Sequence, residues 1–201
     1  PRGFAITAAG HVYITEHSGC RIRYATAGGT VSTLAGKVPT NCVYAIGTGT
    51  AAGFANPFGV SLFGGFLSVS ELSSNRIRSV NTADGSTAVL AGTGVTGYLD
   101  GPPGTSTVTE PFGVATDSTG VAFFTGGVTV RKLDLAAYVT TVAGTGAQAF
   151  NDNVVGVWAE FDWTTGIAID ANDYMFVVDR TQDALRLISP EGVVTTLLPP
   201  A

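Results

Sequence analysis

The chain has 201 residues, with 10 basic and 15 acidic side chains and a formal net charge of −5. So few cations cannot form the extended basic surface that binds a phosphate backbone, which excludes a nucleic acid as partner. The apolar runs are far shorter than the about 20 residues of a membrane helix, so no transmembrane segment is expected.

Three short elements recur along the chain in one order, roughly every 55 residues, which is typical of a repeat architecture. A Pro-x-Gly element opens the units at 1–4, 57–60 and 111–114, and Thr-Thr-Gly-Ile at 164–167 is a fourth copy without its proline. Next comes a segment in which four arginines fall in register: Arg23, Arg78, Arg131 and Arg186. A Leu-Ala-Gly or related segment closes the units at 34–36, 90–92, 142–144 and 197–198.

The fourth unit indicates what one repeat forms. Its apolar and β-branched segments are separated by short turns, which predicts four antiparallel strands, at 166–170, 174–179, 184–189 and 193–198. Four-stranded sheets repeated around an axis form a β-propeller. The chain is therefore predicted to be all-β, one β-propeller region with four four-stranded antiparallel blades, at 1–56, 57–110, 111–163 and 164–201.

The Pro-x-Gly strand is expected to lie innermost, where the strands converge and small residues are needed. Its glycines are Gly3, Gly59, Gly113 and Gly166. An apolar residue stands just before each later copy of this element, and these side chains are expected to fill the gaps between neighbouring blades: Phe54, Val108 and Phe161.

The order of these elements resembles that of NHL-repeat β-propellers. The similarity covers essentially the whole chain and is closest at 57–80 and 166–197. The acid that usually ends the second strand of such a repeat is present at Glu16, Glu71 and Asp179. The third unit departs from the pattern, with Gly126 in place of the acid and Thr129 in place of the first arginine.

The resemblance implies a propeller of usually six blades, whereas this chain supplies four. Either four enlarged blades close on themselves, or the chain is part of a larger propeller. The second interpretation is favoured because the sequence begins in the middle of a motif. In that case other domains or chains must cover the exposed sheet faces and edges.

Two cysteines are present: Cys20 stands in the turn before the arginine-bearing segment of the first unit, and Cys42 stands in the connection after its Leu-Ala-Gly segment. The same positions of the other units hold no cysteine. They are expected to form a disulfide that fastens the first long connection, which would indicate a secreted or surface protein. The alternative is a pair of unrelated free thiols.

Few residues suggest chemistry. The only histidines, His11 and His17, cannot supply a zinc site by themselves. The Gly-x-Gly-x-x-Gly letters at 92–97 are followed by no helix, so no nucleotide cofactor is expected. Asp100 and Asp152 stand at equivalent places in two connections, where they are weak candidates for calcium ligands or simply turn residues.

The connections between units are long, at 37–56, 93–110 and 145–163. Connections of this length are usually functional, and here they would gather on one face. Their aromatic residues suit protein contact, or else they pack the connections on one another: Tyr44, Tyr98, Phe150, Trp158 and Trp163.

We therefore expect no enzyme, no cofactor and no bound metal. The expected function is a protein–protein interaction or structural module of an extracellular or cell-surface protein, with a filament component as one form of it. Its partners would be other protein domains or copies of itself. Two alternatives stay open: a sensor or receptor propeller that binds a ligand at its axis, and part of a metal-dependent, lyase-like enzyme whose site lies in absent blades.

Overall fold

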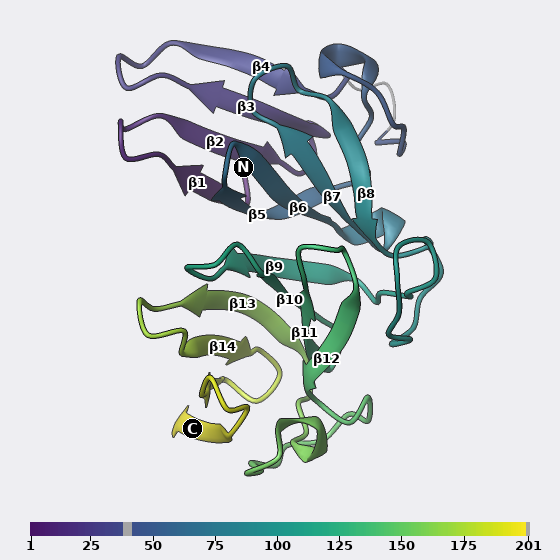
Figure 1. Ribbon diagram of the computed structural model, residues 1–201, viewed down its shortest axis with the longest axis vertical. Coiled ribbons are helices and arrows are strands. Elements are labelled where there is room, and N and C mark those ends of the chain that lie inside the picture. Colours follow the sequence, from purple (N-terminus) through teal and green to yellow (C-terminus); the bar gives the residue numbers. More distant parts are fainter. Residues whose placement is uncertain (38–41, 200–201) are drawn as a thin grey trace.

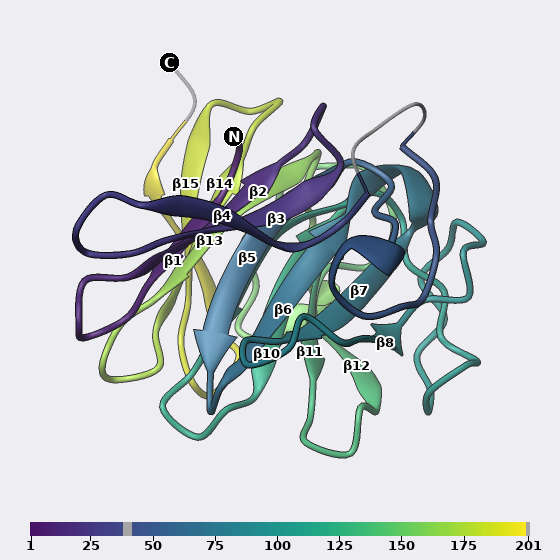
Figure 2. The same ribbon diagram turned by 90° about the horizontal axis from the view of Figure 1, so that it is seen from above.

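The computed structural model describes residues 1–37 and 42–199, and it confirms the all-β prediction with four four-stranded antiparallel sheets. The sheets follow one another in an arc, with contacts between the first strands of successive sheets (Figures 1 and 2). In each sheet, strands that neighbour each other are consecutive in the chain, so every blade is a simple meander. The described residues contain no helix that is long and apolar enough to cross a membrane.

The strands have the following bounds. The first blade contains β1 (Phe4–Ile6), β2 (Val12–Glu16), β3 (Arg21–Ala25) and β4 (Val31–Ala35). The second contains β5 (Pro57–Phe63), β6 (Phe66–Glu71), β7 (Arg76–Asn81) and β8 (Thr87–Ala91). The third contains β9 (Pro111–Thr116), β10 (Ala122–Gly126), β11 (Thr129–Leu133) and β12 (Val139–Ala143), and the fourth contains β13 (Thr164–Ile169), β14 (Met175–Asp179), β15 (Ala184–Ile188) and β16 (Val194–Leu198). The described residues also contain three short 3-10 helices, η1 (Gly49–Ala51), η2 (Leu72–Ser74) and η3 (Gly156–Trp158).

The hydrophobic cores lie between successive blades, where the facing sides of two sheets pack against each other. The core between the first two blades joins Tyr13 and Ile22 of one to Val60 and Leu67 of the other. Phe54 completes this core and is fully buried, as are its equivalents between the later blades, Val108 and Phe161. The prediction that these side chains fill the gaps between blades is therefore confirmed.

Three of the four inner glycines are required by close backbone contacts. A Cβ added to Gly3 would lie 2.6 Å from the carbonyl oxygen of Phe58 in the next blade. For Gly59 the corresponding distance is 2.5 Å to Phe112, and for Gly113 it is 2.5 Å to Thr165. Any side chain at these positions would push neighbouring inner strands apart.

A hydroxyl group joins each blade to the next at the same place. Thr15 Oγ1 accepts a 2.8 Å hydrogen bond from the Gly3 amide and donates a 2.5 Å bond to the Phe58 carbonyl. Ser70 in the second blade and Thr125 in the third form the same pair of bonds, to the carbonyls of Phe112 and Thr165. Each bridge satisfies polar backbone groups in a crowded region, where an unpaired group would be costly.

Three of the four in-register arginines are buried and fasten the long connections. Arg78, Arg131 and Arg186 are each at most 1% exposed. Each guanidinium donates hydrogen bonds of 2.6 to 3.1 Å to two backbone carbonyls of the connection that precedes its blade: Ala45 and Gly53, Leu99 and Thr107, and Asn151 and Glu160, respectively. Two blades add a carboxylate from the connection, since Asp100 binds Arg131 and Asp152 binds Arg186.

The cysteine prediction is confirmed by a disulfide between Cys20 and Cys42, whose Cα atoms are 5.3 Å apart. The bridge closes a loop with a sequence separation of 22 residues. Reduction is expected to lower the free energy of unfolding by about 3 kcal/mol, because the loop then gains conformational entropy in the unfolded chain. Urea unfolding with and without reductant measures this difference.

The matched control is the double variant Cys20→Ser and Cys42→Ser, which should unfold like the reduced chain whether or not reductant is present. An unfolding midpoint that does not change on reduction would contradict the prediction.

Candidate functional site

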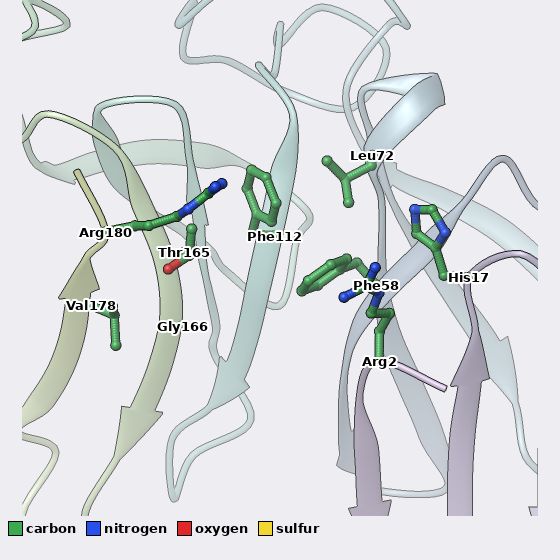
Figure 3. A pocket seen from close by; sticks show the side chains of 9 residues that line it. All are labelled: Arg2, His17, Phe58, Leu72, Phe112, Thr165, Gly166, Val178 and Arg180. Carbon is green, nitrogen blue, oxygen red and sulfur yellow. The ribbon is translucent and has the colours of Figure 1, made fainter. Parts of the chain in front are cut away.

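A pocket of about 710 Å³ opens at the axial end of the inner strands, and two positions of the repeat supply most of its lining. The first is the variable residue of the Pro-x-Gly element and its equivalent, which gives Arg2, Phe58, Phe112 and Thr165. The second is the residue that follows the second strand of a blade, which gives His17, Leu72 and Arg180. Because these positions repeat in every blade, the radial arrangement brings them together from four parts of the chain (Figure 3).

Aromatic rings form a row across the pocket. The His17 and Phe58 ring centroids lie 6.3 Å apart, and those of Phe58 and Phe112 lie 5.2 Å apart, both edge to face. Trp163 continues the row at 6.4 Å from Phe112. Such edge-to-face contacts hold the rings in place and leave an apolar wall for a ligand.

The charged groups of the pocket are all cations. The chain has eight arginines, and six of them donate side-chain hydrogen bonds to other groups of the described chain. The other two, Arg2 and Arg180, have no such bond within the described residues, and both line the pocket. No carboxylate belongs to the lining, although the chain as a whole is acidic.

The surroundings of His17 change the pKa of its imidazole. Burial lowers its pKa, and the charge of Arg2 lowers the pKa further. The imidazole is therefore neutral near pH 7, with Nδ1 3.5 Å from the Asn56 amide nitrogen. At this pH the charged side chains of the pocket lining are the two arginines.

The arrangement is suited to holding an anion, because two guanidinium groups with free donors face an apolar, aromatic surface. In the part of the chain that the structure describes, no carboxylate of the lining lies beside His17 to form a carboxylate–histidine pair. Within the described residues no group of three His, Cys, Asp or Glu side chains could hold a metal ion.

The aromatic residues that were predicted to contact a partner protein lie in several different surroundings. Tyr44 lies over Arg76 at 4.2 Å and Phe150 lies over Arg186 at 4.6 Å, so both rings stack on arginines of the neighbouring blade. Tyr98 packs beside Gly127, and Trp158 is 65% exposed on η3. Trp163 is half-buried at the border of the axial pocket.

The weak calcium candidates have partners within the fold. Asp100 accepts hydrogen bonds from Arg131 and Thr141, and Asp152 accepts them from Arg186 and Thr196. Their equivalent places in the sequence thus correspond to equivalent places in the structure, where they fix a connection to a blade.

Sequence reasoning missed the pocket residues, and above all His17, Arg2 and Arg180. A signal was present, because the Pro-x-Gly element keeps its glycine in every unit while its middle residue changes from arginine to phenylalanine to threonine. A variable position inside an otherwise constant element at the axis is where a propeller can display specific chemistry.

The sequence matches no protein-family model and no curated protein. Solved β-propeller structures match it in fold. An auxiliary nutrient binding protein from Bacteroides thetaiotaomicron is 15% identical with a TM-score of 0.73, over 96% of this chain and 47% of that one. A catalytically inactive virginiamycin B lyase from Staphylococcus aureus, solved with quinupristin, is 16% identical with a TM-score of 0.65, over 98% of this chain and 55% of that one.

A third structural neighbour belongs to a nidogen–laminin complex, with 14% identity and a TM-score of 0.56 over 98% of this chain and 80% of that one. At these identities the likeness concerns the fold alone. The chain spans about half the length of the binding protein and of the lyase.

Proposed function

We propose that this chain is a non-catalytic binding module of an extracellular or cell-surface protein, and that its axial pocket takes an anionic group carried on an apolar body. The observation that carries the proposal is the placement of Arg2 and Arg180, the two arginines without a hydrogen-bond partner in the described chain, in one aromatic pocket. A carboxylate of a partner protein fits this chemistry, since arginine forks bind carboxylates in pairs of hydrogen bonds.

Apolar side chains on the long connections support contact with a protein partner. These connections and the pocket share one end of the blades, and Figure 1 shows the connections along its right-hand side. Several of their apolar residues are exposed: Val43, Ile46, Val95, Leu99, Val154, Val157 and Trp158. A partner that inserts an acidic group in the pocket would cover these residues with its flanks.

The disulfide supports the proposed location, because disulfides persist in oxidising compartments. Assembly with copies of itself, as in a filament, is a second candidate function. It is favoured by exposed apolar side chains on both end blades, among them Phe4 and Ile6 on β1 and Leu198 on β16.

N-Acetyl-phenylalanine is a simple probe of the pocket because it joins a carboxylate to an aromatic ring. We expect it to bind the chain at least about tenfold more tightly than its neutral amide, since charge-assisted hydrogen bonds contribute more than neutral ones. Arg180→Gln is expected to remove this preference without changing the unfolding temperature, because the Arg180 side chain forms no bond to the described chain. NMR titration measures the affinities.

The matched control is Lys132→Gln, which removes an exposed cation of β11 outside the pocket. Equal affinities for acid and amide, or an equal loss in both variants, would contradict the proposal. The pH dependence gives a second readout. As the pH falls below about 6.5, His17 protonates through its lowered pKa, adds a positive charge and strengthens binding of the acid. His17→Gln should abolish that increase and keep the binding seen at neutral pH.

A further inference from the structure

In the third and fourth blades, an arginine and a threonine of the blade bind an aspartate of the connection that precedes it. In the third blade Arg131 pairs with Thr141 across β11 and β12. Asp100 Oδ1 accepts from Arg131 Nε at 3.1 Å and from Nη2 at 2.6 Å. Its Oδ2 accepts from the Thr141 amide at 2.8 Å, and its Oδ1 accepts from the Thr141 hydroxyl at 3.0 Å.

The fourth blade repeats this arrangement with Arg186, Thr196 and Asp152. Asp152 Oδ1 accepts from Arg186 Nε at 3.1 Å and from Nη2 at 2.7 Å. The Thr196 amide and hydroxyl donate to the same carboxylate at 2.8 and 2.9 Å. The same pair of residues, an arginine opposite a threonine, thus binds an aspartate in both blades. We call this arginine and threonine the receptor pair.

The second blade shows what happens without the threonine. Arg78 pairs with Val89, and the connection carries Ile46 at the place of the aspartate, directly after the Ala45 carbonyl that Arg78 binds. Arg78 Nε is then buried without a hydrogen-bond partner among the described residues. Threonine therefore stands opposite the arginine where the connection carries an aspartate, and valine stands there where the connection carries none.

The first blade has the complete receptor pair, Arg23 opposite Thr33. In each of the other three blades a connection lies over the arginine, but no described segment lies over Arg23 and Thr33 in this way. The Arg23 side chain is 20% exposed, its Nε donates to the Ser32 carbonyl of its own blade at 3.0 Å, and its Nη1 lies 3.7 Å from Glu16.

Apolar residues surround this pair on the same sheet face. Phe4 and Ile6 of β1 are 67% and 59% exposed. In the second blade the residues at these places are Val60 and Leu62, which pack in the core that Phe54 completes. The exposed face of the first blade is thus a continuation of an interface that the molecule builds three times.

We propose that this face of the first blade receives a further propeller blade whose connection carries an aspartate in register with Asp100 and Asp152. That connection would offer two backbone carbonyls to the Arg23 guanidinium, its carboxylate to Arg23 and Thr33, and an apolar side chain to Phe4 and Ile6. The long connections of this chain are not the occupant, because each already binds the arginine of the blade that follows it.

A chain with a second copy of residues 57–110 joined ahead of Pro1 tests the proposal, because the copied connection then ends where β1 begins. In this longer chain Arg23→Ala is expected to raise the unfolding equilibrium constant by at least about tenfold, and in the original chain by much less. Replacement of the copied Asp100 by asparagine should reduce the effect of Arg23→Ala, and Thr33→Val should do the same. Urea unfolding of the variants gives the coupling between the two sites.

Equal effects of Arg23→Ala in both chains would overturn the proposal, and so would dimerisation of the original chain that depends on Arg23, which would make a second copy the occupant. If the longer chain does not fold, a synthetic peptide of residues 93–110 is titrated into the original chain and followed by NMR. Binding that is lost in Arg23→Ala and in the Asp100→Asn peptide is expected. Binding that is absent or insensitive to both changes would overturn the proposal.

Discussion

Arg78→Met is expected to lower the free energy of unfolding by about 3–5 kcal/mol, the usual cost of removing one partner of a buried ion pair. Arg78 and Glu71 are both fully buried, with Nη1 3.0 Å from Oε1. Methionine keeps much of the apolar volume but leaves Glu71 without its cation and the carbonyls of Gly53 and Ala45 without a donor. Urea unfolding at pH 7 measures the loss.

The pH dependence and a second substitution identify the cause. Burial already raises the pKa of Glu71 against the opposing charge of Arg78, and without Arg78 the pKa rises further. A group with a raised pKa in the folded state favours folding at low pH, so the deficit of the variant should shrink as the pH falls. Glu71→Gln added to Arg78→Met should recover part of the loss. A deficit that is the same at every pH would assign the loss to packing alone.

Gly113→Ala is expected to lower the free energy of unfolding by about 2–3 kcal/mol, the upper part of the range for an overpacked core. Its Cβ would lie 2.5 Å from the Thr165 carbonyl oxygen of the next blade, a backbone atom that cannot rotate away. The contact would also disturb the Thr125 hydroxyl bridge between the same blades. Differential scanning calorimetry measures the expected fall in unfolding temperature.

The fourth blade supplies a matched control, because Gly166 occupies the same place in the repeat. A Cβ at Gly166 would meet only the Val178 side chain, at 3.4 Å, which is ordinary contact. Gly166→Ala should therefore be tolerated. Similar losses at Gly113 and Gly166 would show that glycine is needed for the strand itself and not for the contact between blades.

The fold could be predicted from the sequence because the residues that stabilise it recur at the same place in each repeat. Gly3, Gly59 and Gly113 meet the same backbone atoms in successive blades, and Phe54 and Phe161 fill the same kind of gap. The pairing of Cys20 with Cys42 is predictable because both lie in loops of the first blade, one before β3 and one after β4. Strand ends differ by one or two residues from the prediction: β13 begins at Thr164 and ends at Ile169, whereas the predicted segment is 166–170.

The axial pocket could not be predicted in the same way. Its members, such as Arg2, Phe58 and Thr165, share a position but no chemistry, so no motif marks them. Asp100 and Asp152 were recognised as equivalent, yet their arginine partners follow 31 and 34 residues later in the chain. Only the radial packing of the blades shows that a side chain in one connection reaches the third strand of the next blade.

The main chain and the side chain of the middle residue in the Pro-x-Gly element have separate roles. In Phe58 and Phe112 the main-chain carbonyl receives the hydroxyl of the preceding blade, while the ring lines the pocket. Since any amino acid supplies that carbonyl, the ring can be exchanged for another side chain with little effect on how the blades join. Gene duplication and point substitution at these inner positions would then give descendants with new ligand preferences on an unaltered framework, which makes this propeller a scaffold on which recognition evolves separately from folding.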